Sequence, residues 1–232
     1  MTIYSCIPSL HGIVTDESRM TDDRILGTWS YDAPTTKELL PGKSDGMIME
    51  RSPKEIDYKF ERAANITCTY ANGGKTVFEG MALSMLKDEE PFITSQELLP
   101  YYILTHRELV NQDTIISYFR VEMTRIQQHT WLDFLPLPQD EGIFAGHFAT
   151  SYVLAHTFGT IDFLDGNIEI RPIDADYIQK LITQKRIRLK HEQRKEDDII
   201  LTASTRDLRE FLNNYCDDGN LLESADRLYP VQ

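Results

Sequence analysis

Residues 54–61 read KEIDYKFE, and this short stretch carries the pattern that decides the fold class. Polar and apolar residues alternate strictly, which places the three apolar side chains on one face of an extended strand. The same alternation returns in ITCTY over residues 66–70, after Asn65, a residue type that favours turns. We therefore predict a half-buried β-hairpin that turns near Asn65.

Outward from this stretch, the chain continues as short strands joined by turn residues. Asn72-Gly73-Gly74 and Asp165-Gly166 contain residue types that adopt positive φ in tight turns, and Gly80 is expected at a bulge or a bend. Further strands are predicted over residues 24–31, 75–86, 101–109, 114–126, 129–135, 151–163 and 167–171. Strands at this spacing are typical of an antiparallel barrel or sandwich and not of alternating βαβ units.

Two short helices are predicted in the C-terminal third, so the expected fold is mainly β with an α+β character. Asp174 is expected to cap the N-terminus of the first helix, residues 174–182, which has an apolar stripe on one side. Ser204 and Asp207 form a variant of the capping box at the start of the second helix.

The domain organisation follows from where ordered elements are predicted. Two strands, residues 188–192 and 199–202, are expected between the helices. The sequence has no internal repeat and no low-complexity linker, so residues 23–232 are predicted to form a single mainly β domain. Residues 1–22 are expected to be a flexible lead or tether.

Composition excludes several classes of function. Thirty-seven acidic residues against 24 lysines and arginines give a net charge of −13, which repels phosphate backbones, so nucleic acid is not an expected partner. No apolar run approaches the roughly 20 residues of a membrane-spanning helix. Membrane association would therefore require an anchor or a surface.

No local motif indicates catalysis. The six histidines have no compact metal-ligand spacing, and the sequence has no Walker loop, nucleophile elbow or dinucleotide fingerprint. We expect no cofactor, no metal and no catalytic residue. The alternative is a hydrolase whose site is assembled from distant residues such as His106, His129 or His147, and a clustered histidine and acid pair in a cleft would favour it.

Cys6 lies in a segment with the residue types of a lipobox, because Ile3 and Ser5 are a branched aliphatic and a small residue at the appropriate positions. Five residues precede Cys6 and contain no apolar signal region. From these residues two interpretations stay open: the sequence begins inside a longer precursor that is lipidated at Cys6, or Cys6 is an ordinary thiol.

Two further segments carry a resemblance. Gly27-Thr28-Trp29 resembles the G-x-W signature of lipocalins, in which the tryptophan packs across the bottom of the barrel. The order of Cys6-Ile7-Pro8-Ser9-Leu10-His11 and this triplet is similar to a family of uncharacterised bacterial lipoproteins that begin with C-x-P-S-L-H. Segments near the C-terminus, residues 168–173, 176–181, 189–192 and 200–205, resemble the same family, whereas residues 32–128 match nothing that we can name.

The resemblance favours the lipoprotein interpretation of Cys6. It implies a lipid anchor on Cys6 and a location in the bacterial cell envelope, and it provides no catalytic assignment. Once Cys6 is acylated, Cys68 and Cys216 remain as a pair that either forms a disulfide or stays as two separately buried thiols. The alternative location is the cytoplasm.

Arg186, Arg188 and Lys190 form the main charge feature of an otherwise acidic chain. On a strand, these three side chains point outward as a cationic ridge. The ridge either meets anionic lipid headgroups or an acidic partner, or it is a solvated face that protects an edge strand from aggregation.

The barrel interior suggests the leading function. Inward residues such as Phe119, Val121 and Met123 either enclose a small apolar ligand or fill the barrel. We therefore expect a noncatalytic envelope lipoprotein that binds a lipophilic small molecule or an envelope partner. The alternatives are the hydrolase and a soluble cytoplasmic β protein, and the oligomeric state is left open.

Overall fold

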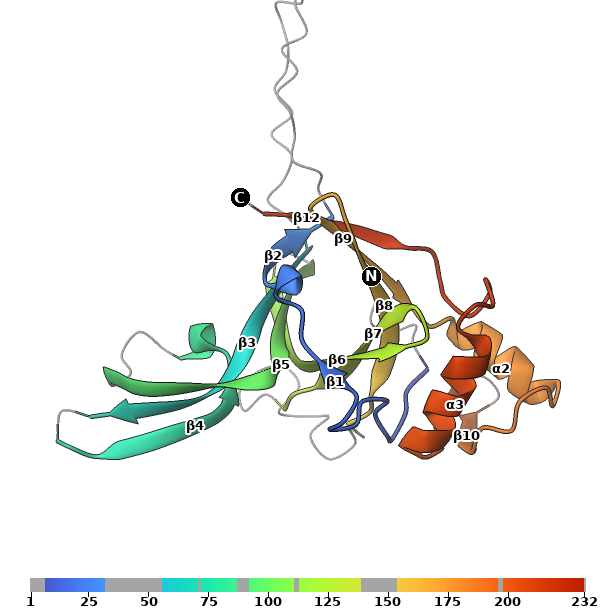
Figure 1. Ribbon diagram of the computed structural model, residues 1–232, viewed down its shortest axis with the longest axis horizontal. Helices are drawn as coiled ribbons and strands as arrows, with labels where there is room; N and C mark the ends of the chain where they lie inside the picture. The colour runs from blue at the N-terminus through green and yellow to red at the C-terminus, as the bar shows by residue number, and fades with distance from the viewer. Residues whose placement is uncertain are drawn as a thin grey trace, which may run out of the picture.

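The computed structural model describes residues 7–31, 56–70, 72–86, 92–110, 113–138, 154–195 and 198–231. The barrel strands are β2 (Gly27–Ser30), β3 (Ile56–Thr69), β5 (Phe92–Val110), β6 (Asp113–Ile126), β7 (His129–Pro136), β8 (Thr157–Leu164), β9 (Asn167–Pro172) and β12 (Asp226–Pro230). They pair antiparallel in the order β6-β5-β3-β2-β12-β9-β8-β7, and β7 pairs back onto β6. The ring seen in Figure 1 is therefore a closed eight-stranded barrel, as in the lipocalin-like prediction, and not a sandwich.

Alternating inward residues form the core of the barrel. Across β5 and β6, Tyr102 lies opposite Val121 and Leu104 lies opposite Phe119. Each fully buried side chain of this size contributes about 1.5 to 3 kcal/mol to folding. The buried cluster includes residues of all eight strands: Trp29, Tyr58, Phe60, Tyr102, Leu104, Phe119, Val121, Met123, Leu132, Phe134, Ile161, Ile168, Ile170 and Leu228.

Strand β3 corrects the predicted hairpin. The segments on either side of Asn65 belong to one continuous strand of 14 residues. The side-chain oxygen of Asn65 accepts a hydrogen bond from the Gly80 backbone N–H at 3.2 Å, so this residue supports a bulge in the neighbouring strand and makes no turn. Gly80 has a φ of 66°, which agrees with the predicted bulge.

The long strands β3 and β5 extend beyond the barrel and form a projecting arm with β4 (Lys75–Met81). A short 3-10 helix, η3 (Leu83–Met85), follows β4. We define the arm as residues 64–70, 72–86 and 92–99. Figure 1 shows the arm leaving the barrel on the side opposite to the helices.

The helices pack together on the barrel. They are α2 (Ala175–Thr183) and α3 (Thr205–Tyr215), and the hairpin of β10 (His191–Lys195) and β11 (Asp198–Leu201) lies between them in sequence. One apolar cluster joins residues of both helices to Trp131 and Phe158 of the barrel. Both predicted caps are confirmed, because Asp174 accepts from the Tyr177 N–H at 2.8 Å and Ser204 accepts from the Asp207 N–H at 3.3 Å.

The described part of the predicted flexible lead is instead packed against the rest of the chain. Ser9 forms backbone hydrogen bonds with His156, and Ile13 is completely buried. A two-residue strand, β1 (Arg19–Met20), pairs with β6, and a 3-10 helix, η2 (Asp23–Ile25), leads into β2. Ile7, Ile13 and Val14 therefore lie in the cluster that joins the barrel to the helices, and Met20 packs on the barrel cluster. Residues 1–6 lie outside the described residues.

Candidate functional site

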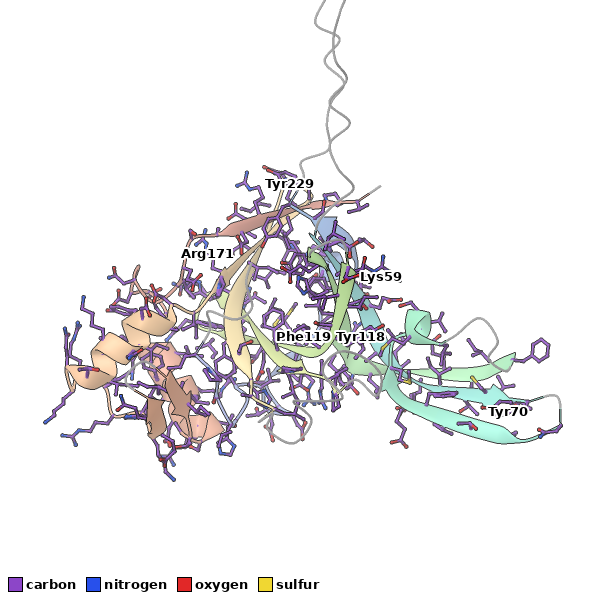
Figure 2. The ribbon with its side chains drawn as sticks, turned by 180° about the vertical axis from the view of Figure 1, so that it is seen from behind. Lys59, Tyr70, Tyr118, Phe119, Arg171 and Tyr229 are labelled. Carbon is purple, nitrogen blue, oxygen red and sulfur yellow. The ribbon has the colours of Figure 1, made fainter. Side chains whose placement is uncertain are left out.

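The interior of the barrel is filled by its own side chains. Phe119, Val121 and Met123, which we considered as the lining of a ligand cavity, are 8%, 0% and 0% exposed. Phe119 lies inside the ring of strands in Figure 2, among the aromatic residues of the barrel cluster. Trp29 is 6% exposed and its indole N–H donates to the Ile25 carbonyl at 2.8 Å, so this residue also packs in that cluster.

His106 is a polar side chain that lies against this interior, and one of its ring nitrogens has no hydrogen-bond partner in the part of the chain that the structure describes. His106 is opposite Tyr58 in the β3–β5 register, and their rings stack with centroids 4.8 Å apart. Among the described residues, His106 Nε2 is buried without a hydrogen-bond partner. Burial lowers the pKa of His106 to about 4. His106 is therefore neutral near pH 7, and within the described chain it has no acidic partner that would favour the hydrolase alternative at this residue.

The arm carries an unusual concentration of exposed apolar side chains. Of the eleven large hydrophobic residues exposed in the described chain, six lie on the arm, with Phe92 82% and Leu98 61% exposed. The other four are Tyr70, Val77, Leu83 and Ile93. Figure 2 shows Tyr70 far out on the arm. Solvent-exposed apolar residues gathered in one place mark interaction sites.

The arm also presents open strand edges. Residues 92–98 of β5 pair with β3, whereas the pairing of β5 with β6 begins only at Tyr102. Within the described residues, β4 pairs with β3 alone. Three residues, 99–101, stand opposite Ala63 where the arm leaves the barrel, and Pro100 among them has no N–H to donate.

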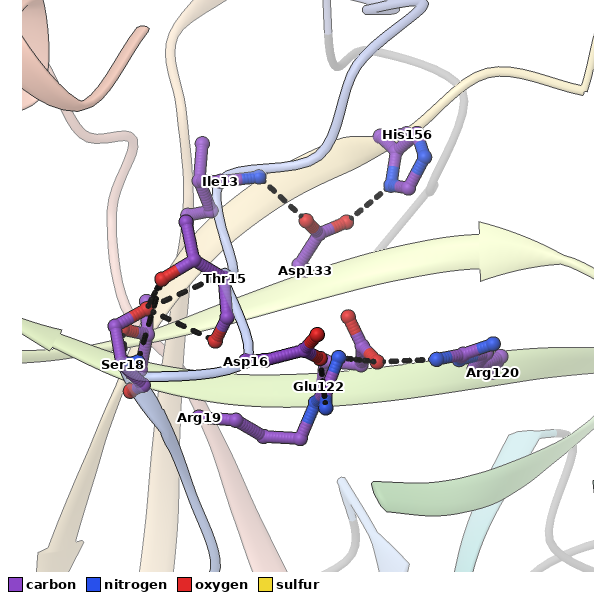
Figure 3. A network of polar contacts seen from close by, with 10 residues as sticks. Ile13, Thr15, Asp16, Ser18, Arg19, Arg120, Glu122, Asp133 and His156 are labelled. Carbon is purple, nitrogen blue, oxygen red and sulfur yellow. Dashed lines mark hydrogen bonds and ion pairs between the residues drawn. The ribbon is translucent and has the colours of Figure 1, made fainter. Parts of the chain in front are cut away.

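Two histidine–acid pairs occur in the described structure. The first is His156 with Asp133, whose carboxylate is 2% exposed. Asp133 accepts from the Ile13 N–H at 2.7 Å and lies 2.6 Å from His156 Nδ1, as Figure 3 shows. Gly12 packs so closely that an added Cβ would lie 2.5 Å from this carboxylate. These contacts fasten the N-terminal segment, which is a structural role.

The second pair is His129 with Asp217, and Cys216 lies beside it. His129 Nε2 and Asp217 Oδ1 are 3.4 Å apart, and with the Cys216 sulfur these ligand atoms all lie within 4.8 Å of one another. The group borders a pocket of about 420 Å³ that Arg171, Asp218 and Glu223 also line. Three metal-ligating residue types thus meet at one pocket, although we expected no metal site.

The Cys216 thiol is not activated as a nucleophile by its surroundings. Burial first, and then the neighbouring charge of Asp217, raise the pKa of this thiol. The weak donor contact of its sulfur is to the Asn213 carbonyl at 3.9 Å. Cys68 lies in a separate apolar cluster on the arm, and both cysteines are free thiols, so they form no disulfide with each other.

The cationic ridge is exposed but does not lie on a strand. Arg186, Arg188 and Lys190 point to solvent while Leu189 is buried, in the predicted alternation. The strand that we expected from residue 188 begins at His191 as β10 instead. Cys6 and His147 lie outside the described residues, and no helix within the described ranges has the length and apolarity that a membrane crossing needs.

Sequence reasoning predicted the arm segments 66–70 and 75–86 and the turn between them, but it missed residues 92–99 of β5 and so the projecting arm. It also missed the His129–Cys216–Asp217 group, for a different reason. The apolar residues of β5 near Phe92 lie in a segment without clear alternation, so the sequence did not predict a strand there. Only the pairing with β3 shows that this segment is a strand with solvent-exposed apolar side chains. The second group joins His129, which we named only as a candidate residue of the hydrolase alternative, to Cys216 and Asp217, which lie 87 and 88 positions later in the sequence.

Comparisons with known proteins add no assignment. No protein-family model, curated protein or solved structure matches this chain.

Proposed function

We propose that this protein is a noncatalytic binding protein of the bacterial envelope, in which the barrel is a scaffold and the arm binds a protein partner. The observation that carries the proposal is the placement of six of the eleven exposed large hydrophobic residues on the arm. Removing such side chains from water on binding contributes about 25 cal/mol per Å² of apolar surface. A filled barrel interior favours a partner over a small apolar ligand.

The expected occupant is an extended segment of another polypeptide with alternating apolar residues. Such a segment adds as a strand to an open sheet edge, where backbone hydrogen bonds give affinity and side-chain contacts give specificity. Natural edge strands are protected by charged residues, yet the described arm contains only Lys75, Glu79 and Glu97. Among its described residues, the arm therefore carries few charges for a chain with a net charge of −13.

The proposed anchor and the cationic ridge fit one orientation at a membrane. Pro8, two residues after Cys6, accepts a backbone hydrogen bond from Leu201, and the next residue, Thr202, donates to the Lys190 carbonyl. The segment that follows Cys6 therefore lies beside the ridge. With Cys6 acylated, Arg186, Arg188 and Lys190 would face anionic headgroups, each contributing about 1 kcal/mol near the surface.

Site-specific photo-crosslinking in the bacterial host tests the partner. A photoreactive phenylalanine analogue replaces Phe92 on the arm, and a matched variant carries it at Leu164, an exposed apolar residue of the barrel that is 43% exposed. We expect position 92 to crosslink one defined protein other than this chain, and position 164 not to do so. A peptide from that protein should then bind the purified chain and lose binding to Phe92→Glu.

Three results would contradict the proposed partner. These are equal crosslinking at both positions, no crosslinking at either, and a crosslinked dimer of this chain, which would assign the arm to self-association instead.

The anchor is tested by the intact mass of the protein recovered from host membranes. We expect a chain that starts at Cys6 with added acyl mass, whereas an unmodified chain found only in the soluble fraction would overturn the envelope location. For the ridge, reversal to glutamate at Arg186, Arg188 and Lys190 should weaken binding to vesicles with anionic lipid. The matched control reverses three other exposed cations, Lys75, Arg107 and Arg125. An equal loss of vesicle binding in the control would mean that binding depends on net charge and not on the position of the ridge.

A further inference from the structure

We propose that His129, Cys216 and Asp217 form a zinc site at the junction between the barrel and helix α3. Their ligand atoms lie within 4.8 Å of one another, and the imidazole Nε2 is 3.4 Å from the carboxylate Oδ1. Zinc–ligand bonds of about 2.0 to 2.3 Å in a tetrahedron place neighbouring ligand atoms roughly 3.3 to 3.8 Å apart. The imidazole–carboxylate distance already falls in this range, and the remaining ligand atoms, which lie within 4.8 Å, need to move closer by about 1 Å at most to bind one ion.

The donor set selects the class of metal. A thiolate and an imidazole favour a borderline ion such as Zn²⁺, whereas Mg²⁺ and Ca²⁺ prefer oxygen ligands alone. A zinc ion would also compensate the accumulation of acidic groups here, since Asp217, Asp218 and Glu223 all line the same pocket.

Packed elements hold the three ligands in place. His129 is the first residue of β7, directly after a turn in which Gln127 has a positive φ of 54°. Cys216 is the C-cap of α3, and its N–H donates to the Leu212 carbonyl at 2.8 Å. Gln127 donates to the Asn213 side chain at 2.7 Å, so the turn is fastened to the helix.

The arrangement has room for adjustment and for a fourth ligand. Cys216 is buried, His129 is 27% exposed and Asp217 is 72% exposed. Asp217 Oδ1 also accepts from the Gln128 side-chain amide at 2.5 Å, so metal binding displaces this contact or uses the other carboxylate oxygen. The fourth position faces the pocket of about 420 Å³, where water or an anion near Arg171 can enter. Three protein ligands with an open position are the arrangement of zinc sites that bind exogenous ligands.

The neighbouring Asp218 provides a matched control. Its carboxylate accepts from the Tyr177 hydroxyl at 2.5 Å and from the Asn220 side chain at 2.9 Å, so it is already engaged outside the proposed ligand set. Asp218→Asn therefore changes the same charge in the same pocket without removing a ligand. Cys68 supplies a second control, as a buried thiol in a separate cluster.

Binding of Zn²⁺ and Co²⁺ to the purified, reduced chain tests the site. We expect one metal ion per chain, and a thiolate-to-cobalt absorption band in the Co²⁺ form. Cys216→Ser should abolish this band. His129→Gln and Asp217→Asn should each weaken zinc affinity at least roughly tenfold in competition with a chromophoric chelator. Asp218→Asn and Cys68→Ser should keep both the band and the affinity.

The outcomes separate a site from nonspecific binding. Absence of the cobalt band in the folded wild-type chain would overturn the proposal, as would a band that survives Cys216→Ser or disappears in Cys68→Ser. Equal weakening by Asp217→Asn and Asp218→Asn would exclude Asp217 as a ligand. Circular dichroism establishes whether each variant is folded. If Cys216→Ser does not fold, the loss of zinc affinity in His129→Gln decides the test, because His129 is partly exposed.

Discussion

His106 makes the stability of this protein depend on pH, and the size of the effect follows from its burial. The ring is 7% exposed inside the barrel, and burial lowers its pKa from 6.5 to about 4. The unfolded chain binds the proton below pH 6.5, and the folded chain does so only near pH 4. Stability is therefore lost as the pH falls from about 6.5 to about 4, because the unfolded state takes up more protons.

Replacement by phenylalanine isolates this effect. At pH 5 the difference in proton binding destabilises the wild-type fold by about 2 kcal/mol relative to pH 7, taking 1.36 kcal/mol per pKa unit. His106→Phe keeps an aromatic ring against Tyr58 and removes the buried, unpartnered Nε2. Any overpacking by the larger ring is the same at both pH values and cancels in the comparison.

Urea denaturation at pH 7 and pH 5 measures the effect. We expect the wild type to lose about 2 kcal/mol more than His106→Phe between these two pH values. His11→Phe, at an exposed histidine, is the control and should retain the wild-type difference. If His106→Phe shows the same loss as the wild type, the reasoning about a buried neutral imidazole is refuted.

Three further predictions follow from the packing. Asp133→Ala removes the acceptor of the Ile13 N–H and the partner of His156, so the free energy of unfolding should fall by about 3 kcal/mol. The N-terminal segment should also be cleaved faster by protease, and unchanged protease resistance would contradict this role. Gly159→Ala should destabilise the fold by about 1 to 3 kcal/mol, because the added Cβ would lie 2.8 Å from the Arg171 carbonyl oxygen. At Gly219 an added Cβ meets no atom within 4 Å, so Gly219→Ala should change stability by less than about 0.5 kcal/mol. Equal effects of the two variants in thermal denaturation would count against close strand packing at Gly159. The folded, purified protein should take up no lipophilic fluorescent probe, since side chains fill the barrel. Saturable uptake of one probe per chain would reinstate a ligand-binding barrel.

Local features of the fold were predictable where a few adjacent residues determine the backbone. Asp174 and Ser204 satisfy N–H groups at the first turn of each helix, which depends only on neighbouring residues. The turn at Asp165-Gly166 has φ values of 49° and 81°, as that residue pair favours. Alternation placed Phe119, Val121 and Met123 on the inner face of β6, and they are buried there.

Other features depended on pairing between distant strands. Asn65 resembles a turn residue, yet β3 continues through it because β5 pairs along almost its whole length. β12 contains one buried apolar residue, Leu228. It forms a strand because it pairs antiparallel with β2 on one side and β9 on the other. No local pattern in Asp226–Pro230 predicts that closure.

The candidate sites also differ in whether they lie within one segment of the sequence or join distant segments. The exposed cations Arg186, Arg188 and Lys190 were visible in the sequence, because an alternating charged segment needs only its own residues. The arm and the His129–Cys216–Asp217 group were not visible, because each joins segments that the fold brings together.

By itself, the sequence determined the strand-rich composition, the inward and outward faces of individual strands, the helix starts and the tight turns. These properties arise from side-chain alternation and short-range hydrogen bonds. Only the tertiary structure decided that the barrel closes, that its interior is filled, that β3 and β5 continue into an exposed arm, and that His129 meets Cys216. Strand order and register are set by the joint burial of residues far apart in the chain, and no single segment contains that information.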